Sequence, residues 1–114
     1  MRLRSLALLA ASAVVLIFVE GCASSENIAP AVTPAMVSAS RGASAETLNE
    51  GRRIFAGPCT TCHAPDPVSK YSLTEWHAAV DEMAPRTKLN AERRAALLAY
   101  IAAAKATDVV SSSR

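Results

Sequence analysis

The stretch Cys59-Thr60-Thr61-Cys62-His63 places two thiols and an imidazole within five residues, and the rest of the chain is best interpreted from it. The sequence around this motif is poor in large apolar side chains, since only fourteen fall between Glu46 and Thr107. Domains of fewer than about 70 to 80 residues usually need a disulfide, a metal or a cofactor to be stable. We therefore expect the motif to supply the link that stabilises this domain.

The order C-x-x-C-H is typical of covalent attachment of a c-type haem. Two thiols three positions apart can each add to one vinyl group, which clamps the edge of the porphyrin to a single turn of chain. The next residue then lies beneath the iron, where an imidazole serves as the proximal ligand. The motif thus predicts one covalent haem c on Cys59 and Cys62, with His63 as an iron ligand.

Three other uses of the cysteine pair remain as alternatives. A thioredoxin-like redox pair needs a βαβ scaffold, and the sequence lacks the alternation of half-buried strands. A structural zinc site would have to add the distant His77, and the adjacency of Cys62 and His63 does not match zinc spacings. A plain disulfide suits an exported protein but leaves His63 without a role. Haem is the interpretation that we prefer.

Helical signals lie on both sides of the motif. Apolar residues recur at helical spacing over 46–56, and Gly57-Pro58 ends that helix directly before Cys59. The two prolines within 64–67 then predict a loop. The first helix should therefore deliver the chain to the motif, and the loop should follow it.

Two further helices are predicted beyond the loop. Ser72 and Glu75 form a capping box that opens the second helix, and Pro85 should end it. Asn90 can cap the third, whose apolar face would consist of Leu97, Tyr100, Ile101 and Ala104. The pattern predicts an all-α fold, a three-helix domain over 46–107 followed by a frayed tail over 108–114.

From Glu46 to about Lys105 the chain resembles the small monohaem c-type cytochromes with histidine and methionine ligation. Besides the attachment motif, Gly51 and Tyr100 match a family feature, in which a glycine lets the terminal helices cross closely and an aromatic ring packs on the contact. The resemblance implies helices wrapped around one haem. It also implies that Trp76 packs on the haem edge, with its indole N–H a candidate donor to a propionate.

The resemblance further implies Met83 as the second axial ligand. Met83 lies only twenty residues after His63, a shorter loop than in larger members, so His77 and an open distal site are the alternatives. We expect the thioether to turn inward because Met83 lies just before Pro85, where the chain should leave helical geometry.

A histidine–methionine pair raises the reduction potential and closes the iron to substrates. The implied function is single-electron transfer without enzymatic activity. A haem domain with an open distal site, as a small-ligand sensor or an enzyme subunit, is one alternative. A non-haem lipoprotein held by a disulfide is another.

The pattern of residues 1–21 predicts that the protein is exported. Basic residues precede the apolar run 6–19, which is shorter than the about 20 residues of a membrane span. The sequence Glu20-Gly21-Cys22 resembles a bacterial lipobox, although a small uncharged residue is usual where Glu20 stands. We expect a lipidated Cys22 that anchors the protein at the periplasmic face of a membrane. Ala23 after the cysteine is similar to what outer-membrane lipoproteins of Gram-negative bacteria show, and this resemblance implies the outer membrane rather than the inner.

Residues 22–45 carry the lipidated cysteine and are otherwise rich in Ala, Ser, Pro and Thr, which predicts a flexible linker with Met36 solvated.

The net charge of +2 offers no basic field for nucleic acid. The expected partners are redox proteins, whose identity the sequence does not give, and the membrane that holds the anchor. Four basic side chains are predicted to be solvated rather than bound to haem propionates: Arg52, Arg53, Arg86 and Lys88.

Overall fold

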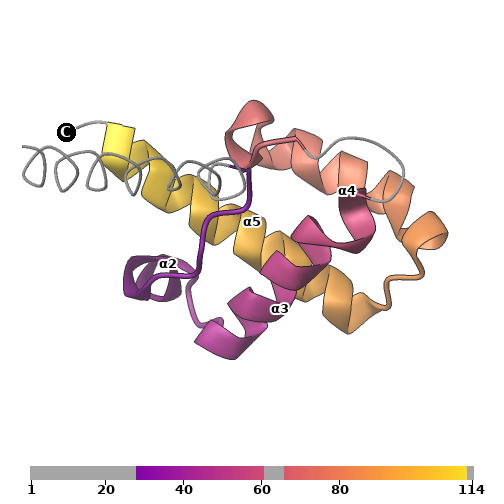
Figure 1. Ribbon diagram of the computed structural model, residues 1–114, viewed down its shortest axis with the longest axis horizontal. Coiled ribbons are helices and arrows are strands. Elements are labelled where there is room, and N and C mark those ends of the chain that lie inside the picture. Colours follow the sequence, from indigo (N-terminus) through magenta and orange to yellow (C-terminus); the bar gives the residue numbers. More distant parts are fainter. Residues whose placement is uncertain (1–27, 61–65, 113–114) are drawn as a thin grey trace, which may run out of the picture.

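The computed structural model describes residues 28–60 and 66–112. Most of these residues are helical and none forms a strand, in agreement with the all-α class (Figure 1). The motif residues Cys62 and His63, the leader and Cys22 lie outside the described residues. The elements are α2 (Pro34–Ala39), α3 (Ala45–Ala56), the 3₁₀ turns η1 (Pro58–Thr60) and η2 (Val68–Lys70), α4 (Leu73–Thr87) and α5 (Ala91–Ser112).

Helix α3 starts where a serine can cap it. The Ser44 hydroxyl accepts a hydrogen bond from the Thr47 amide at 3.1 Å, and Glu46 places a negative charge in the positive first turn. The helix then crosses α5 at Gly51. A Cβ at this position would lie 2.6 Å from the Tyr100 Cβ and closer still to the backbone of Ala96. The expected close approach of glycine and tyrosine is therefore confirmed.

Helix α4 opens on the predicted capping box. The Ser72 hydroxyl accepts from the Glu75 amide at 3.3 Å, and the Glu75 carboxylate accepts from the Ser72 amide at 2.8 Å. The prediction that Pro85 ends this helix is wrong, because α4 continues through Thr87. A proline near the end of a helix removes only one backbone hydrogen bond. The helix ends instead at Lys88, which adopts the left-handed conformation with φ 54°.

Helix α5 starts as predicted and runs further than predicted. The Asn90 side-chain oxygen accepts from the Arg93 amide at 2.8 Å. The four residues expected to form its apolar face are all buried. The backbone remains helical through Ser112, so the frayed tail expected over 108–114 is wrong for its described part. Nothing in 108–112 breaks a helix, since proline and glycine are absent there.

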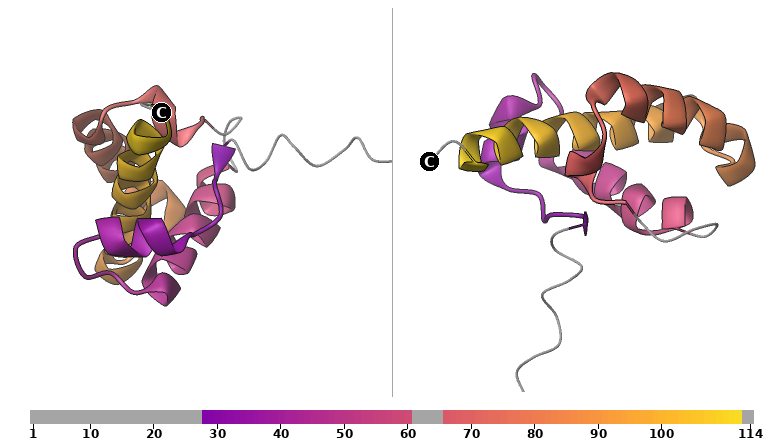
Figure 2. Two further views of the ribbon diagram at one scale, coloured as in Figure 1. Left: turned by 90° about the vertical axis from the view of Figure 1, so that its left-hand side faces the viewer. Right: turned by 90° about the horizontal axis from the view of Figure 1, so that it is seen from above.

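The flexible linker expected over 22–45 is wrong for residues 28–45. Thr33 caps α2, and Met36, predicted to be solvated, is only 2% exposed within the core. The segment before α2 is held by α3 and α5: Tyr100 donates to the Pro30 carbonyl at 2.7 Å, and Arg52 donates to the same oxygen at 3.1 Å. The views in Figure 2 show this segment and α2 lying along the other helices. Tertiary packing thus orders a sequence of low helical periodicity.

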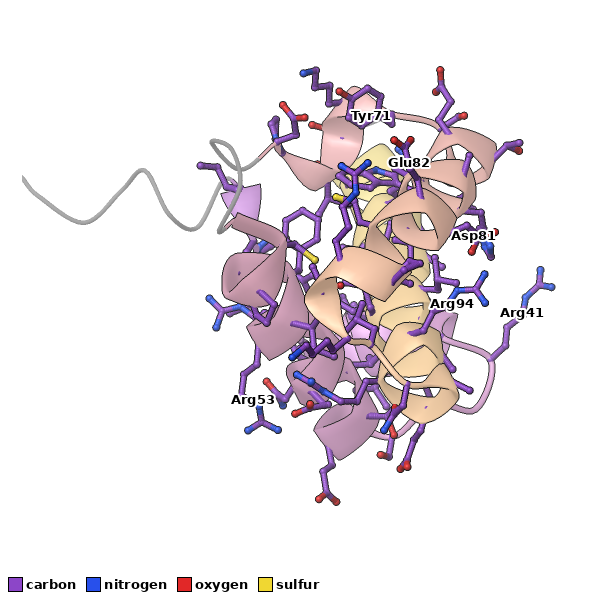
Figure 3. The ribbon with its side chains drawn as sticks, turned by 90° about the vertical axis from the view of Figure 1, so that its right-hand side faces the viewer. Arg41, Arg53, Tyr71, Asp81, Glu82 and Arg94 are labelled. Atoms are coloured by element: carbon purple, nitrogen blue, oxygen red, sulfur yellow. The ribbon has the colours of Figure 1, made fainter. Side chains whose placement is uncertain are left out.

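Helices α4 and α5 are linked at the surface as well as in the core. Figure 3 shows Asp81 of α4 beside Arg94 of α5, and the two side chains form an ion pair. Both are partly exposed, so this pair contributes little to stability. The buried apolar side chains supply most of it. No helix among the described residues has the length and apolar character that crossing a membrane requires.

Candidate functional site: an apolar cavity beside Cys59

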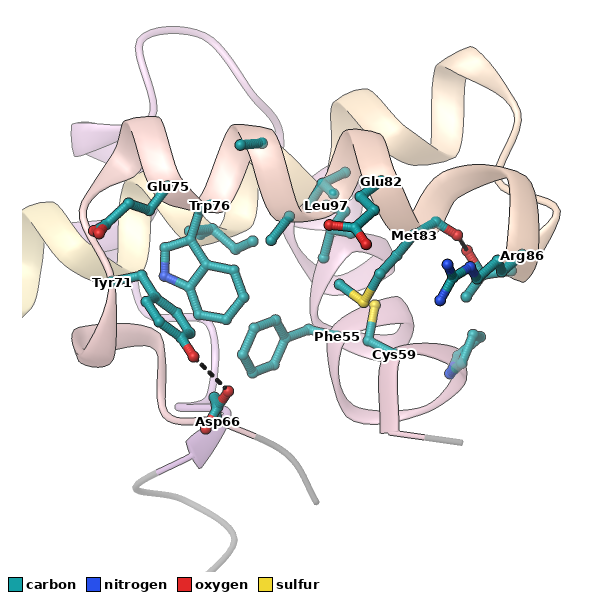
Figure 4. A pocket seen from close by; sticks show the side chains of 16 residues that line it. Phe55, Cys59, Asp66, Tyr71, Glu75, Trp76, Glu82, Met83, Arg86 and Leu97 are labelled. Carbon is teal, nitrogen blue, oxygen red and sulfur yellow. Dashed lines mark hydrogen bonds between the residues drawn. The ribbon is translucent and has the colours of Figure 1, made fainter. Parts of the chain in front are cut away.

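A cavity of about 530 Å³ lies between α4 and the rest of the fold. Its walls come from one face of α4, from the end of α3 with η1, from the segment between Asp66 and Tyr71, and from two apolar residues of α5, Leu97 and Ile101. Most of the exposed lining is apolar (Figure 4). Sites for cofactors and small ligands commonly have about this volume and character.

Cys59 enters the cavity from η1. Helix α3 ends at Gly57, and the following turn places the thiol half-buried among the lining residues. Burial raises the pKa of the Cys59 thiol above its ordinary value. Redox-active C-x-x-C cysteines have a lowered pKa instead, because a nearby positive charge or helix N-terminus favours the thiolate. Cys59 stands after the end of a helix, so its surroundings argue against the thioredoxin-like alternative.

Met83 faces the same cavity from α4. Its side chain is half-buried, and Figure 4 shows the sulfur atoms of Met83 and Cys59 both pointing into the cavity. The expected cause was wrong, because α4 does not leave helical geometry at Pro85 but continues through Thr87. The residue points inward because it belongs to the buried face of α4. His77 is exposed and lies outside the cavity wall.

The wall on α4 follows the helical repeat. Trp76, Ala79, Val80 and Met83 are spaced three and four residues apart, and all line the cavity. Ala79 is the small member of this row. Sequence reasoning missed Ala79, although its position between Trp76 and Met83 on one helical face could have identified it.

Trp76 is held by neighbours within the protein. Its indole N–H donates to the Val68 carbonyl at 2.9 Å, so the suggestion that it donates to a haem propionate is wrong for this structure. The ring meets Phe55 and Tyr71 edge-on, with centroid distances of 5.5 and 5.2 Å. These contacts fix the orientation of the indole at the cavity wall. Phe55 and Tyr71 also line the cavity, and sequence reasoning did not assign them there.

The polar lining includes side chains of both charges. Asp66 accepts hydrogen bonds from Tyr71 at 3.1 Å and from Lys70 at 2.7 Å. Of the four basic side chains considered from the sequence, only Arg86 lines the cavity. Arg53 is exposed and pairs with Glu50 at 2.9 Å.

The residues that the structure brings together are Cys59, Met83 and Trp76, three of the five predicted at the cofactor. Cys62 and His63 are outside the described residues, yet Cys59 and Asp66 on either side of them both line the cavity. Across the described ranges, no group of three or more His, Cys, Asp or Glu side chains could hold a metal ion. A prosthetic group that brings its own metal does not need such a cluster.

Comparison with known proteins gives no match to any protein family, curated protein or solved structure.

Proposed function

We propose that this protein is a single-electron carrier with one covalently bound haem c. The observation that carries the proposal is that Cys59 of the C-x-x-C-H motif and Met83 open into one apolar cavity between α3, α4 and α5. The motif supplies the residues for attachment, and the cavity adjoins it. Cys59 and Cys62 would form the thioether links, and His63 and Met83 would bind the iron.

The residues present fit such a group. The cavity is of cofactor size, and its thiol, thioether and aromatic side chains are chemically suited to an apolar macrocycle. Ala79 lines the same wall, and Trp76 is held edge-on by Phe55 and Tyr71. These side chains would keep water from most of the site. When bound, haem c supplies a one-electron iron couple.

The residues that bind the iron decide whether a haem protein transfers electrons or catalyses a reaction. A neutral thioether together with an imidazole would favour the reduced iron and would leave no coordination position for a substrate. With Met83 as the second ligand, the protein exchanges electrons and performs no reaction of its own. This supports a carrier rather than an enzyme, although such a domain can also serve as the haem subunit of an oxidoreductase complex.

The leader and Cys22 support a location at a membrane for this carrier. We propose export through the signal of residues 1–21, lipidation of Cys22 and a position at the periplasmic face of a bacterial membrane, the outer rather than the inner. Redox proteins would be its electron donor and acceptor. The nearly balanced charge of the chain gives no support for nucleic acid as a partner.

Haem attachment is tested by producing the protein in a bacterium with a functioning c-type haem-attachment system. The parent should retain haem on the polypeptide after denaturation, and Cys59→Ala/Cys62→Ala should lose it. Thr60→Ala/Thr61→Ala is the matched control, because it changes the middle of the motif and spares both thiols. A parent free of haem, with Cys59 and Cys62 joined in a disulfide, would overturn the proposal in favour of the non-haem lipoprotein.

A further inference from the structure

We propose that the lipid anchor at Cys22 holds the folded domain directly against the bilayer, with the surface around Ile28 and η2 nearest to the lipid. This inference rests on the lipidation included in the proposed function. It names the kind of partner, a lipid surface, and the part of the domain that faces it. A long flexible linker would instead let the domain move freely above the membrane.

The folded part of the chain is already packed at Ile28. Ile28 packs against the core, and Ala29 is buried. Arg52 of α3 donates to the Ala29 carbonyl at 3.0 Å and to the Pro30 carbonyl at 3.1 Å. Tyr100 of α5 donates to the Pro30 carbonyl as well. Both larger helices therefore fix the point at which the chain leaves the domain.

The distance from this point to the anchor is limited by covalent geometry. Ile28 follows Cys22 by six residues. A fully extended chain gains at most about 3.6 Å per residue, so the two are separated by no more than about 22 Å whatever the chain does between them. The domain surface near Ile28 cannot move further from the lipid than this.

The same side of the domain carries the segment that follows the haem-attachment motif. In all views of Figures 1 and 2 the start of the described chain lies beside the segment of Asp66 and η2. Val68 of η2 and Ala29 belong to one buried cluster. In Figure 1 and in the right view of Figure 2, the first turn of α5, with Glu92, lies away from the start of the described chain. Electrons would therefore enter or leave close to the bilayer.

Charge does not explain this placement, because acidic and basic side chains nearly balance. Adsorption through charge would weaken in high salt, whereas a covalent anchor is insensitive to it. The proposal thus predicts that the lipidated protein floats with neutral phosphatidylcholine vesicles in low salt and in molar sodium chloride alike. Loss of flotation in high salt, or no flotation of the parent, would overturn it. The haem spectrum of the same sample reports on the proposed function independently.

Energy transfer to a headgroup-labelled lipid in these vesicles tests the orientation. The haem-loaded, lipidated protein carries a donor dye at Ser69→Cys in η2 or, as the matched control, at Glu92→Cys in α5; both positions are exposed. Transfer from position 69 should exceed transfer from position 92. A flexible Gly-Ser insertion after Ala23 should lower transfer from position 69 and reduce the difference. Equal transfer from both positions, or no change on insertion, would overturn the proposal.

Discussion

Side chains of very different size form the α4 wall of the cavity. Trp76 and Met83 are large, whereas Ala79 between them contributes one methyl group. The space above Ala79 exists only because the residue is small. Cys59 and Met83 supply the sulfur atoms, but Ala79 provides room for anything bound between them. At the residue scale, the capacity of the cavity therefore depends on an alanine.

Ala79→Leu should fill this space and lower the amount of haem bound per polypeptide, while the helix content stays the same because leucine favours helices. The measurement is the haem-to-protein absorbance ratio, with circular dichroism for the helices. Ala95→Leu is the matched control, because Ala95 is exposed on α5 outside the cavity. Equal haem content in the two variants would show that the cavity does not hold the haem.

Ionisation of the Tyr100 hydroxyl should lower the stability of the protein in alkaline solution. Burial raises the pKa of Tyr100 to about 12 from its ordinary value of 10.0. The folded protein holds this proton more tightly than the unfolded chain, so the stabilisation is fully present below about pH 10 and is lost as the pH rises towards 12. The loss is at most about 2.7 kcal/mol.

Tyr100→Phe should therefore flatten the decline in unfolding free energy between about pH 10 and pH 12. At neutral pH the variant should lose about 1 kcal/mol, because the hydrogen bond to Pro30 is missing. Urea unfolding of parent and variant, compared at each pH, separates Tyr100 from the other groups that titrate there. The same alkaline decline in both proteins would contradict the assigned burial.

At the scale of elements, the crossing of α3 and α5 depends on Gly51. Gly51→Val should lower the unfolding free energy by about 3 kcal/mol, the upper part of the range for overpacking, because the new atoms meet the Ala96 backbone. Thermal unfolding measures this effect. Ala56→Val, at an exposed position of the same helix, is the control. Equal midpoints for both variants would mean that the helices do not touch at Gly51.

Helix beginnings could be predicted from the sequence because their signals are local. Ser72 with Glu75, and Asn90, each satisfy amide groups three residues away, so a few letters of sequence contain the whole interaction. Helix ends were harder to predict. Pro85 is tolerated in the last turn, and the length of α5 beyond residue 107 is not marked by any stop signal.

At the scale of the whole molecule, the prediction that the folded domain begins at residue 46 was wrong. The sequence before residue 46 has the composition of a linker, and α2 is too short to show a helical repeat. Met36 is buried only because α3 and α5 lie against it, an arrangement that involves residues far along the chain. Composition does not contain that information.

Met36→Ala should lower the unfolding free energy by about 3 kcal/mol, since it removes a side chain that is 2% exposed. Met36→Leu, which preserves the volume, should cost less than about 1.5 kcal/mol. Urea unfolding followed by circular dichroism gives both values. If Met36→Ala leaves the unfolding free energy unchanged, the segment before residue 46 is a flexible linker after all. The short tether inferred above would then be wrong as well.

Part of the candidate site could be predicted from the sequence. Cys59 could be predicted from its motif and Met83 from the family resemblance, and both line the cavity. Phe55, Tyr71 and the α5 residues could not be assigned, because their place in the wall depends on how three helices pack. The role of Trp76 was only half predictable, since the acceptor of its N–H is the backbone of Val68, which lies eight residues earlier.

The central claim, a haem iron bound by His63 and Met83, is tested most directly by the absorption spectrum of oxidised Met83→Ala beside that of the parent. The parent should show the weak red-end band of methionine bound to iron and should not bind carbon monoxide when reduced. Met83→Ala should keep the covalent haem, lose that band and bind carbon monoxide, while His77→Ala behaves as the parent. A Met83→Ala spectrum identical to that of the parent, or a parent that already binds carbon monoxide, would contradict the claim.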